Sequence, residues 1–478
     1  MGLKQKTIFG LIWTSAGTLV NGLISIIVTI VLSRVLEPYD FALIALLIVF
    51  VAVSNVLIDS GFTQAIIRDD NPSQQDLSTV FFFNFIMSII LYAILFCLSP
   101  YIATFFDAPE LELLSKVVFL VIVFNSVSII QNAMLNRELR FAWVAGATAL
   151  SYVIGGIVSV VIVFLGFGVW AIVANMVIPP FAKSIILWVK SSWRPLFTFS
   201  FKSLKKYLHF GIFLTIQGLI DVVVTNLNSI FIGKFYTKSE LGYYSQGGKM
   251  DSYVITPIVS VLQKVTYPIL SKIKNDEERL KEGYRKIITM TLFTYLPIVF
   301  FVIIFSDPVI VMFLGEKWSD AGIFLKISAI GSLIYPLQKI CENIVMVKGK
   351  TRQMLYMALI KQTLRILVMF LFVYRGVLAL AWGFMLTGIL GGLLYIYIGM
   401  KYLGYTLGEF LCDNGKIVLL SFGVSLLLYI ILINIELGGL YIIMGGIFVF
   451  CGYLFLSYLL NRDRTCEWFD IIRAIRKR

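Results

Sequence analysis

The chain is a succession of apolar runs of about 20 residues that are separated by short polar segments. A helix of about 20 residues crosses the roughly 30 Å hydrocarbon core of a bilayer. The composition agrees, because 59% of the 478 residues are hydrophobic and 14% are charged, whereas a soluble domain carries about 25% charged residues. We therefore predict an all-α integral membrane protein with about fourteen transmembrane helices. The predicted spans are 8–32, 41–66, 78–105, 113–134, 141–164, 168–189, 207–231, 247–270, 287–305, 321–347, 353–374, 377–398, 417–433 and 440–460.

Lysine and arginine residues are concentrated in every second loop between these spans. By the positive-inside rule, the basic loops are cytoplasmic, and an even number of spans places both termini on that side. The formal net charge of +13 is therefore mainly a signal of membrane topology, with contact to anionic lipid headgroups as a second use. It does not indicate nucleic-acid binding.

Two basic residues, Lys361 and Arg365, lie inside the span 353–374. A spacing of four places them on one helix face, and Arg365 lies roughly 18 Å from the cytoplasmic end, near the bilayer centre. A cation at this depth costs at least about 2.5 kcal/mol unless it faces water, a counter-ion or a ligand. We predict that this face lines a polar cavity. The alternative is a structural pair with a buried carboxylate.

Two further lysines inside spans are candidates for the same cavity. Lys339 is followed by Glu342, a spacing that also allows a local ion pair. Lys264 lies in the stretch VLQKVTYP, where a cavity role and a structural role are equally compatible with the sequence.

Buried acidic residues are fewer. Asp59 and Asp221 lie within the second and seventh spans. An intramembrane carboxylate can bind a coupling proton or sodium ion, or it can be the structural counter-ion of a buried lysine. Two glycine pairs, Gly155–Gly156 and Gly391–Gly392, are interpreted as positions of close helix packing.

An internal repeat divides the chain. VLSRVLEPYDFAL (31–43) matches FIGKFYTKSELGY (231–243) in character, with Arg34 opposite Lys234 and Asp40 opposite Glu240. Six spans separate the copies, so both halves run in the same direction and are related by a pseudo-two-fold axis along the membrane normal. We predict two six-helix lobes, 1–200 and 201–403, followed by two additional helices and a basic cytoplasmic tail in 404–478.

Four stretches carry a resemblance to a known family. They are TIFGLIWTSAGTLVNGLISIIVTIVLSRVLEPYDFALIAL, LIDSGFTQAIIR, QNAMLNRELRFAWVA and LGYYSQGGKMDSYVITPIVSVLQKVTYPILSKI. They resemble the polysaccharide-exporter branch of the multidrug/oligosaccharidyl-lipid/polysaccharide (MOP) exporter superfamily, the Wzx-type flippases. The likeness covers essentially the whole chain and implies a fourteen-helix fold of two pseudo-symmetric lobes.

The resemblance also implies a function. Such proteins move a polyprenyl-diphosphate-linked oligosaccharide across the bacterial inner membrane, for a membrane polymerase that builds O-antigen lipopolysaccharide, capsule or exopolysaccharide. Lys361 and Arg365 are then expected to pair with the diphosphate, and Lys264 and Lys339 to attract the headgroup. An ion bound near Asp221 or Asp59 would drive alternating access.

Three other functions stay open at this point. A lipid II flippase is close in chemistry, whereas a multidrug exporter usually carries cations, which a basic cavity repels. A membrane glycosyltransferase or polysaccharide ligase belongs to a different class and needs a substantial outward loop with catalytic residues. The outward loops here are short, and the sequence shows no nucleophile with a base partner, phosphate-binding loop or metal-ligand cluster. We therefore expect a transporter without catalytic residues, cofactor or metal.

Overall fold

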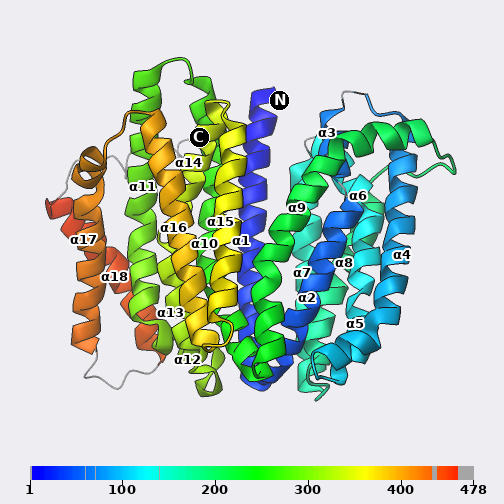
Figure 1. The fold of residues 1–478 in the computed structure, drawn as a ribbon, viewed down its shortest axis with the longest axis horizontal. Coiled ribbons are helices and arrows are strands. Elements are labelled where there is room, and N and C mark those ends of the chain that lie inside the picture. Colours follow the sequence, from blue (N-terminus) through cyan, green and yellow to red (C-terminus); the bar gives the residue numbers. More distant parts are fainter. Residues whose placement is uncertain (1–2, 60, 70, 139, 433–438, 461–478) are drawn as a thin grey trace. The chain divides into compact units, whose positions relative to one another are not determined.

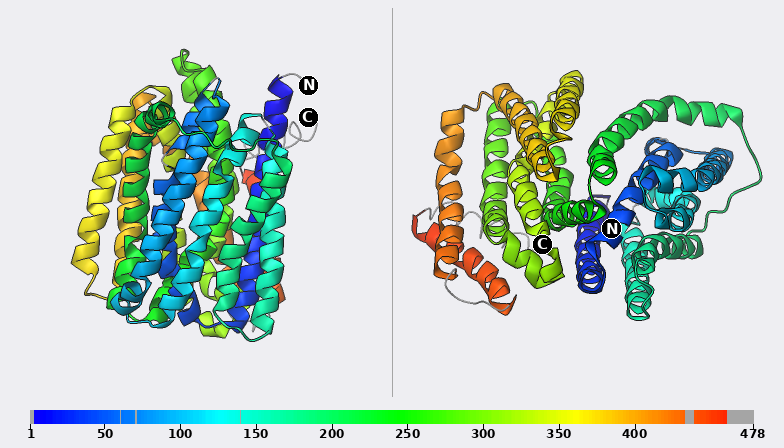
Figure 2. Two further views of the ribbon diagram at one scale, coloured as in Figure 1. Left: turned by 90° about the vertical axis from the view of Figure 1, so that its right-hand side faces the viewer. Right: turned by 60° about the horizontal axis from the view of Figure 1, so that its bottom comes forward.

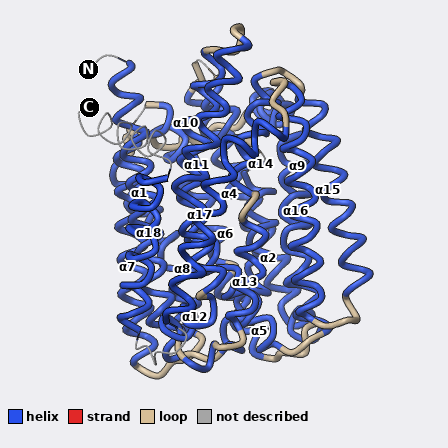
Figure 3. Tube along the Cα trace, turned by 90° about the vertical axis from the view of Figure 1, so that its left-hand side faces the viewer, coloured by secondary structure: helices blue, strands red, loops and turns tan. Residues whose placement is uncertain are grey.

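The computed structural model describes residues 3–59, 61–69, 71–138, 140–432 and 439–460. Every regular element in these ranges is a helix, and none is a β-strand (Figure 3). Twelve of the described helical segments are long and apolar enough to cross a membrane, and Gly445–Leu459 adds a shorter apolar stretch. The prediction of an all-α membrane protein is confirmed.

Each predicted span falls on one helix or on two consecutive helices (Figure 1). The helices are α1 (Leu3–Val35), α2 (Pro38–Asp59), α3 (Phe62–Arg68), α4 (Gln74–Phe105), α5 (Glu110–Val118), α6 (Leu120–Arg137), α7 (Phe141–Phe164), α8 (Trp170–Lys190), α9 (Phe201–Phe235), α10 (Lys238–Lys272), α11 (Glu277–Ile304), α12 (Ser306–Leu314), η1 (Glu316–Trp318), α13 (Ala321–Ser332), α14 (Tyr335–Val347), α15 (Thr351–Phe372), α16 (Val377–Tyr402), α17 (Leu407–Leu432) and α18 (Gly439–Leu460).

Some predicted spans are divided into two helices, which hydropathy does not reveal. The span 41–66 is divided before α3, where Gly61 has a φ of 69°, a conformation that glycine adopts without steric cost. The span 321–347 is divided before α14, whose first turn contains Pro336. At that position the missing N–H of proline removes no helical hydrogen bond, so the residue starts a new helix.

The chain packs as two compact units, Met1–Ser245 and Gln246–Arg478. α1 to α9 lie in the first unit and α11 to α18 in the second, and α9 is visibly curved in Figure 2. The division at residues 200 and 403 follows the sequence repeat instead, and the pseudo-symmetry of the two lobes stays a prediction.

Close helix packing in the first unit depends on a glycine pair. A Cβ atom on Gly155 of α7 would lie 2.5 Å from Cγ of Pro179 on α8. A Cβ atom on Gly156 would lie 2.7 Å from Cγ2 of Val28 on α1. Both distances are far below van der Waals contact, so the three helices could not approach this closely with larger residues. The packing role predicted for this pair is confirmed.

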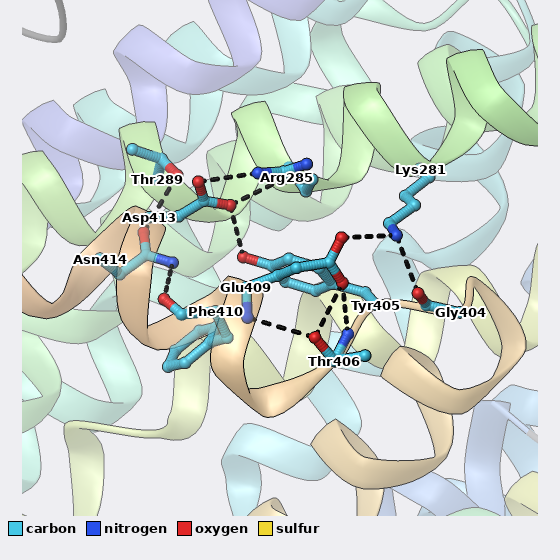
Figure 4. Close-up of polar contacts among 10 residues, drawn as sticks. All are labelled: Lys281, Arg285, Thr289, Gly404, Tyr405, Thr406, Glu409, Phe410, Asp413 and Asn414. Carbon is cyan, nitrogen blue, oxygen red and sulfur yellow. Dashed lines mark hydrogen bonds and ion pairs between the residues drawn. The ribbon is translucent and has the colours of Figure 1, made fainter.

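In the second unit, a polar network joins the N-terminal part of α17 to the N-terminal half of α11 (Figure 4). Arg285 donates from Nε and Nη2 to the two carboxylate oxygens of Asp413, at 2.7 and 2.8 Å. The hydroxyl of Tyr405 donates to Oδ2 of Asp413 at 2.8 Å. Thr289 Oγ1 donates to Oδ1 of Asn414 at 3.0 Å. A bidentate pair of this kind fixes both distance and orientation, so it sets the register of α17 on α11.

The start of α17 is fixed by the same network. The backbone N–H of Thr406 donates to Oε2 of Glu409 at 2.7 Å, and the N–H of Glu409 donates to Oγ1 of Thr406 at 3.2 Å. This reciprocal pair is a capping box, which satisfies two N–H groups that have no partner within the helix. Lys281 of α11 donates from Nζ to Oε1 of Glu409 and to the carbonyl oxygen of Gly404, both at 2.8 Å.

We predict that Asp413→Ala destabilises the protein by about 2–3 kcal/mol, because it removes the acceptor of three charge-assisted or phenolic hydrogen bonds. The thermal unfolding midpoint in detergent should fall. Glu282→Ala, at an exposed position of α11, is the matched control and should leave the midpoint unchanged. Equal midpoints for the two variants would contradict the role assigned to the network.

Candidate functional site

The two cations that the sequence places inside one span lie on α15, and both side chains are half-buried. Lys361 donates from Nζ to Oε1 of Gln338 on α14 at 3.2 Å. Its aliphatic chain lies against α16, where a Cβ atom on Gly391 would be 2.8 Å from both Cγ and Cδ of Lys361. Gly391 thus provides the space that Lys361 occupies. The packing role predicted for this second glycine pair is confirmed.

The contact of Lys361 continues along α14. Gln338, which is 4% exposed, donates from Nε2 to Oε1 of Glu342 at 2.7 Å. Oε2 of Glu342 accepts from Nζ of Lys339 at 2.8 Å. The local ion pair that the spacing of Lys339 and Glu342 allowed is therefore present. The four side chains form a chain of polar contacts that carries two formal positive charges and one negative charge.

Arg365 lies one helical turn from Lys361 and has a different environment. Its guanidinium carbon lies 5.5 Å from the ring centroid of Phe384 on α16, a cation–π distance. Its Nε is buried and has no hydrogen-bond partner among the described residues. No carboxylate in the described part of the chain forms an ion pair with Arg365. The structural alternative, a pair with a buried acid, therefore has no support at Arg365.

This arrangement is suited to an anion. An unpaired guanidinium inside a membrane protein is costly, and an anionic ligand removes that cost. Arginine offers a planar fork that matches two phosphate oxygens, and lysine offers a mobile point charge. The lysine side chain can exchange a neutral amide oxygen for an anionic one at little cost. Among the residues that the structure describes, no group of three or more His, Cys, Asp or Glu side chains is placed to hold a metal ion.

The predicted ion-coupling residues Asp59 and Asp221 lie on α2 and α9. Oδ1 of Asp59 accepts from the backbone N and from Oγ1 of Thr63, at 3.2 and 2.6 Å, and so bridges the break between α2 and α3. Asp221 is exposed on α9. Both belong to the first unit, whereas Lys361 belongs to the second. The side chain of Lys264 lies outside the described residues.

Two polar residues of the second unit, Gln338 and Asp251, were missed by sequence reasoning. Gln338 and Glu342 are four residues apart within a predicted span, a spacing that could have identified them as one polar face. Asp251 lies in the predicted span 247–270 and is 8% exposed. Its hydrogen-bond partners, Ser328 and Ser332, are remote in sequence, so no local pattern indicates it.

The helix arrangement is similar to that of solved membrane transporters. "Lipid II flippase MurJ, inward closed conformation" matches with a TM-score of 0.76 at 18% identity, over 95% of this chain and 99% of that chain. An inward-facing multidrug resistance MATE family transporter of the MOP superfamily matches with a TM-score of 0.62 at 17% identity, over 80% and 94%. The chain thus shares the all-α fold of these transporters.

The sequence comparisons give the family. Residues 31–323 match the family described as "Polysaccharide biosynthesis protein", and the chain belongs to this family. It is 24% identical over 350 residues to "Teichuronic acid biosynthesis protein TuaB" of Bacillus subtilis (strain 168), covering 73% of this chain and 72% of that protein. It is 23% identical over 419 residues to "Lipopolysaccharide biosynthesis protein WzxC" of Escherichia coli (strain K12), covering 84% and 82%. The polysaccharide-exporter resemblance is confirmed.

We predict that Gly391→Ala lowers the thermal unfolding midpoint, by an amount equivalent to about 1 kcal/mol, because the new methyl group displaces the chain of Lys361. Gly388→Ala on the same helix is the control, since a Cβ atom there has no neighbour within 4 Å. It should leave the midpoint unchanged or raise it, because alanine favours the helix over glycine. A loss of stability in Gly388→Ala alone would contradict this packing.

Proposed function

We propose that the protein is a flippase that translocates a polyprenyl-diphosphate-linked oligosaccharide repeat unit by alternating access. The translocated unit then serves the assembly of O-antigen, capsule or exopolysaccharide. Membership of the polysaccharide biosynthesis family supports this proposal, as do relatives named for teichuronic acid and lipopolysaccharide biosynthesis. The protein acts as a transporter and not as an enzyme.

The observation that carries the proposal is the cationic face of α15. Arg365 is half-buried without an acid partner among the described residues, and Lys361 lies one turn away. A diphosphate supplies several anionic oxygens within the reach of two such side chains. It is also the part of a lipid-linked sugar that crosses hydrocarbon least readily, so a flippase has to bind it.

Binding of the diphosphate follows from the contacts already present. Arg365 takes two phosphate oxygens in its fork, and Lys361 leaves Gln338 for a third oxygen, because a charged acceptor binds an ammonium group more strongly than an amide does. Lys339 and Lys264 attract the headgroup as it enters. Glu342 holds Lys339 in place and limits the excess positive charge. The polyprenyl tail stays in the surrounding lipid.

The cycle also needs a driving ion and a membrane context. We place the protein in the bacterial inner membrane with both termini in the cytoplasm, in accordance with the distribution of basic residues. A proton or sodium ion bound near Asp221 or Asp59 drives the cycle. The partners are the lipid-linked oligosaccharide, the membrane lipids and a membrane polymerase of the same pathway.

Removal of either cation should slow transport strongly. We expect Arg365→Ala and Lys361→Ala to lower the rate of flipping about ten- to hundredfold, the effect of losing one charge-assisted hydrogen bond. The assay uses purified protein in liposomes and a fluorescent polyprenyl-diphosphate oligosaccharide. Arg375→Ala, at the exposed end beyond α15, is the matched control and should flip at the wild-type rate.

Other substrates in the same flipping assay test the alternative functions, a lipid II flippase and a multidrug exporter. A polyprenyl monophosphate sugar should compete weakly, because it lacks the second phosphate group. If Arg365→Ala and Lys361→Ala both flip the substrate at the wild-type rate, the two cations have a structural role and do not bind the diphosphate. Transport of lipid II alone, or of a cationic dye alone, would replace the proposed substrate with that one.

The proposed topology is tested by cysteine labelling in a variant without native cysteines. A cysteine at Glu282, near the start of α11, should be protected from a membrane-impermeant maleimide in intact spheroplasts and labelled after lysis. A cysteine at Glu316 in η1 should be labelled in intact spheroplasts. Both positions are exposed, so the difference depends on the side of the membrane alone. The reverse pattern would invert the orientation.

A further inference from the structure

The second unit contains a buried carboxylate that the substrate site does not use. Asp251 of α10 is 8% exposed and lies against α13. Oγ of Ser328 donates to Oδ2 of Asp251 at 2.8 Å, and Oγ of Ser332 donates to Oδ1 at 3.1 Å. Each carboxylate oxygen therefore has one serine hydroxyl within hydrogen-bond distance, and both serines lie on one face of α13. The Oγ of Ser332 also lies 2.9 Å from the carbonyl oxygen of Ala329, so its one proton has two acceptors.

A third hydroxyl completes the surroundings of Asp251. The fully buried Tyr295 of α11 donates to the carbonyl oxygen of Ser332 at 2.9 Å and to its Oγ at 3.1 Å. One turn before Asp251, a Cβ atom on Gly247 would lie 2.7 Å from the backbone nitrogen of Leu325 on α13. The two helices are therefore in close contact at this level, and the hydroxyl groups are held in fixed positions.

No basic side chain among the described residues forms an ion pair with Asp251. The nearest charged residues in sequence are Lys249 on α10 and Lys326 on α13, two residues from Asp251 and Ser328 respectively. Residues two apart on a helix do not face the same side. Lys249 is exposed, and its Nζ lies 6.0 Å from the ring centroid of Tyr253.

Of the helices packed against α13, α12 carries Asp307, which lies beside Gly322, more than one helical turn before Ser328. The charged residues of α11, α14 and α16 lie at other levels. The charged residues of α11 all lie between its start and Lys286, well before Tyr295. The one charged residue of α16 is Lys401, in its last turn. On α14, Lys339 forms its ion pair with Glu342. The titratable group that faces the Asp251 site is the phenol of Tyr295.

We infer that Asp251 is a proton-binding site, whose carboxyl group is neutral in one state of the transport cycle and ionised in another. An isolated carboxylate in a membrane protein is costly, and protonation removes that cost without any movement of a basic residue. The hydroxyl groups can serve both forms, because each can donate to the carboxylate or accept from the protonated acid.

The site is distinct from Asp59 and Asp221, and its coupling to transport rests on the proposed function. In each cycle, Asp251 binds a proton from one side of the membrane and releases it to the other side. This proton movement accompanies the translocation of the lipid-linked sugar. Proton binding itself can be measured without any substrate.

The first experiment is infrared difference spectroscopy of purified protein in nanodiscs during a pH titration. Wild-type protein should show the carbonyl band of a protonated carboxylic acid, and Asp251→Asn should lose it. Asp320→Asn, at an exposed position before α13, should keep the band. Ser328→Ala retains the acid and should move the band to higher frequency, because the carbonyl loses a hydrogen bond. Identical spectra for wild type and Asp251→Asn, or a band removed by sodium chloride but not by potassium chloride at constant pH, would overturn the inference.

The second experiment measures coupling. Flipping of the fluorescent polyprenyl-diphosphate oligosaccharide in liposomes should be faster under an imposed pH gradient for wild type and Asp320→Asn. The flipping rate of Asp251→Asn should not depend on the pH gradient. If Asp251→Asn does not fold, Asp251→Glu replaces it, and its rate should also be independent of the gradient, because the longer side chain disturbs the serine contacts. A gradient effect that persists in these variants would exclude Asp251. An absence of flipping by wild type, with the infrared band intact, would refute the proposed function and not the proton site.

Discussion

Hydrocarbon offers no hydrogen-bond partners, and this constraint determines where polar side chains lie in the protein. A buried polar group therefore has to find its partner within its own helix or on a neighbouring one. Asp413 takes its partners from α11 and the segment before α17, Asp251 from α13, and Gln338 from α14 and α15. The contacts of Asp413 with α11 and of Asp251 with α13 connect helices that are not consecutive in the sequence. The polar groups that need partners away from water therefore also fix how these helices pack. The buried Nε of Arg365 has no such partner among the described residues, and the positive charge of this side chain indicates an anionic ligand.

Small residues decide where such contacts can form. Because Gly391 has no side chain, the aliphatic chain of Lys361 fits between α15 and α16. Gly247 allows α10 to contact α13 closely, one turn from Asp251. Without a driving force from water between helices, the packing of membrane helices depends on close backbone approach. In both places a glycine lies beside an ionisable side chain, because a short interhelical distance lets a polar group reach its partner and excludes lipid.

The sequence predicts those parts of the structure that depend on residues close to one another in the chain. Apolar length predicts the helices, and the spacing of Lys339 and Glu342 anticipates their ion pair. The spacing of Lys361 and Arg365 identifies the cationic face for the same reason. The breaks before α3 and α14 are not predicted, since hydropathy averages over a single glycine or proline. Asp251 is missed because Ser328 and Ser332 are 77 and 81 residues away, and only the folded bundle brings them together.

The inferred proton site and the proposed diphosphate site are connected by consecutive helices. Ser328 and Ser332, the partners of Asp251, are on α13, and Gln338, the partner of Lys361, is near the start of α14. Only a short break between the two helices separates Ser332 from Gln338. A change in the charge of Asp251 alters its hydrogen bonds to α13, and α14 is the next element along the chain. Coupling between the two sites therefore requires no long pathway through the protein, because one continuous segment contacts both ionisable groups.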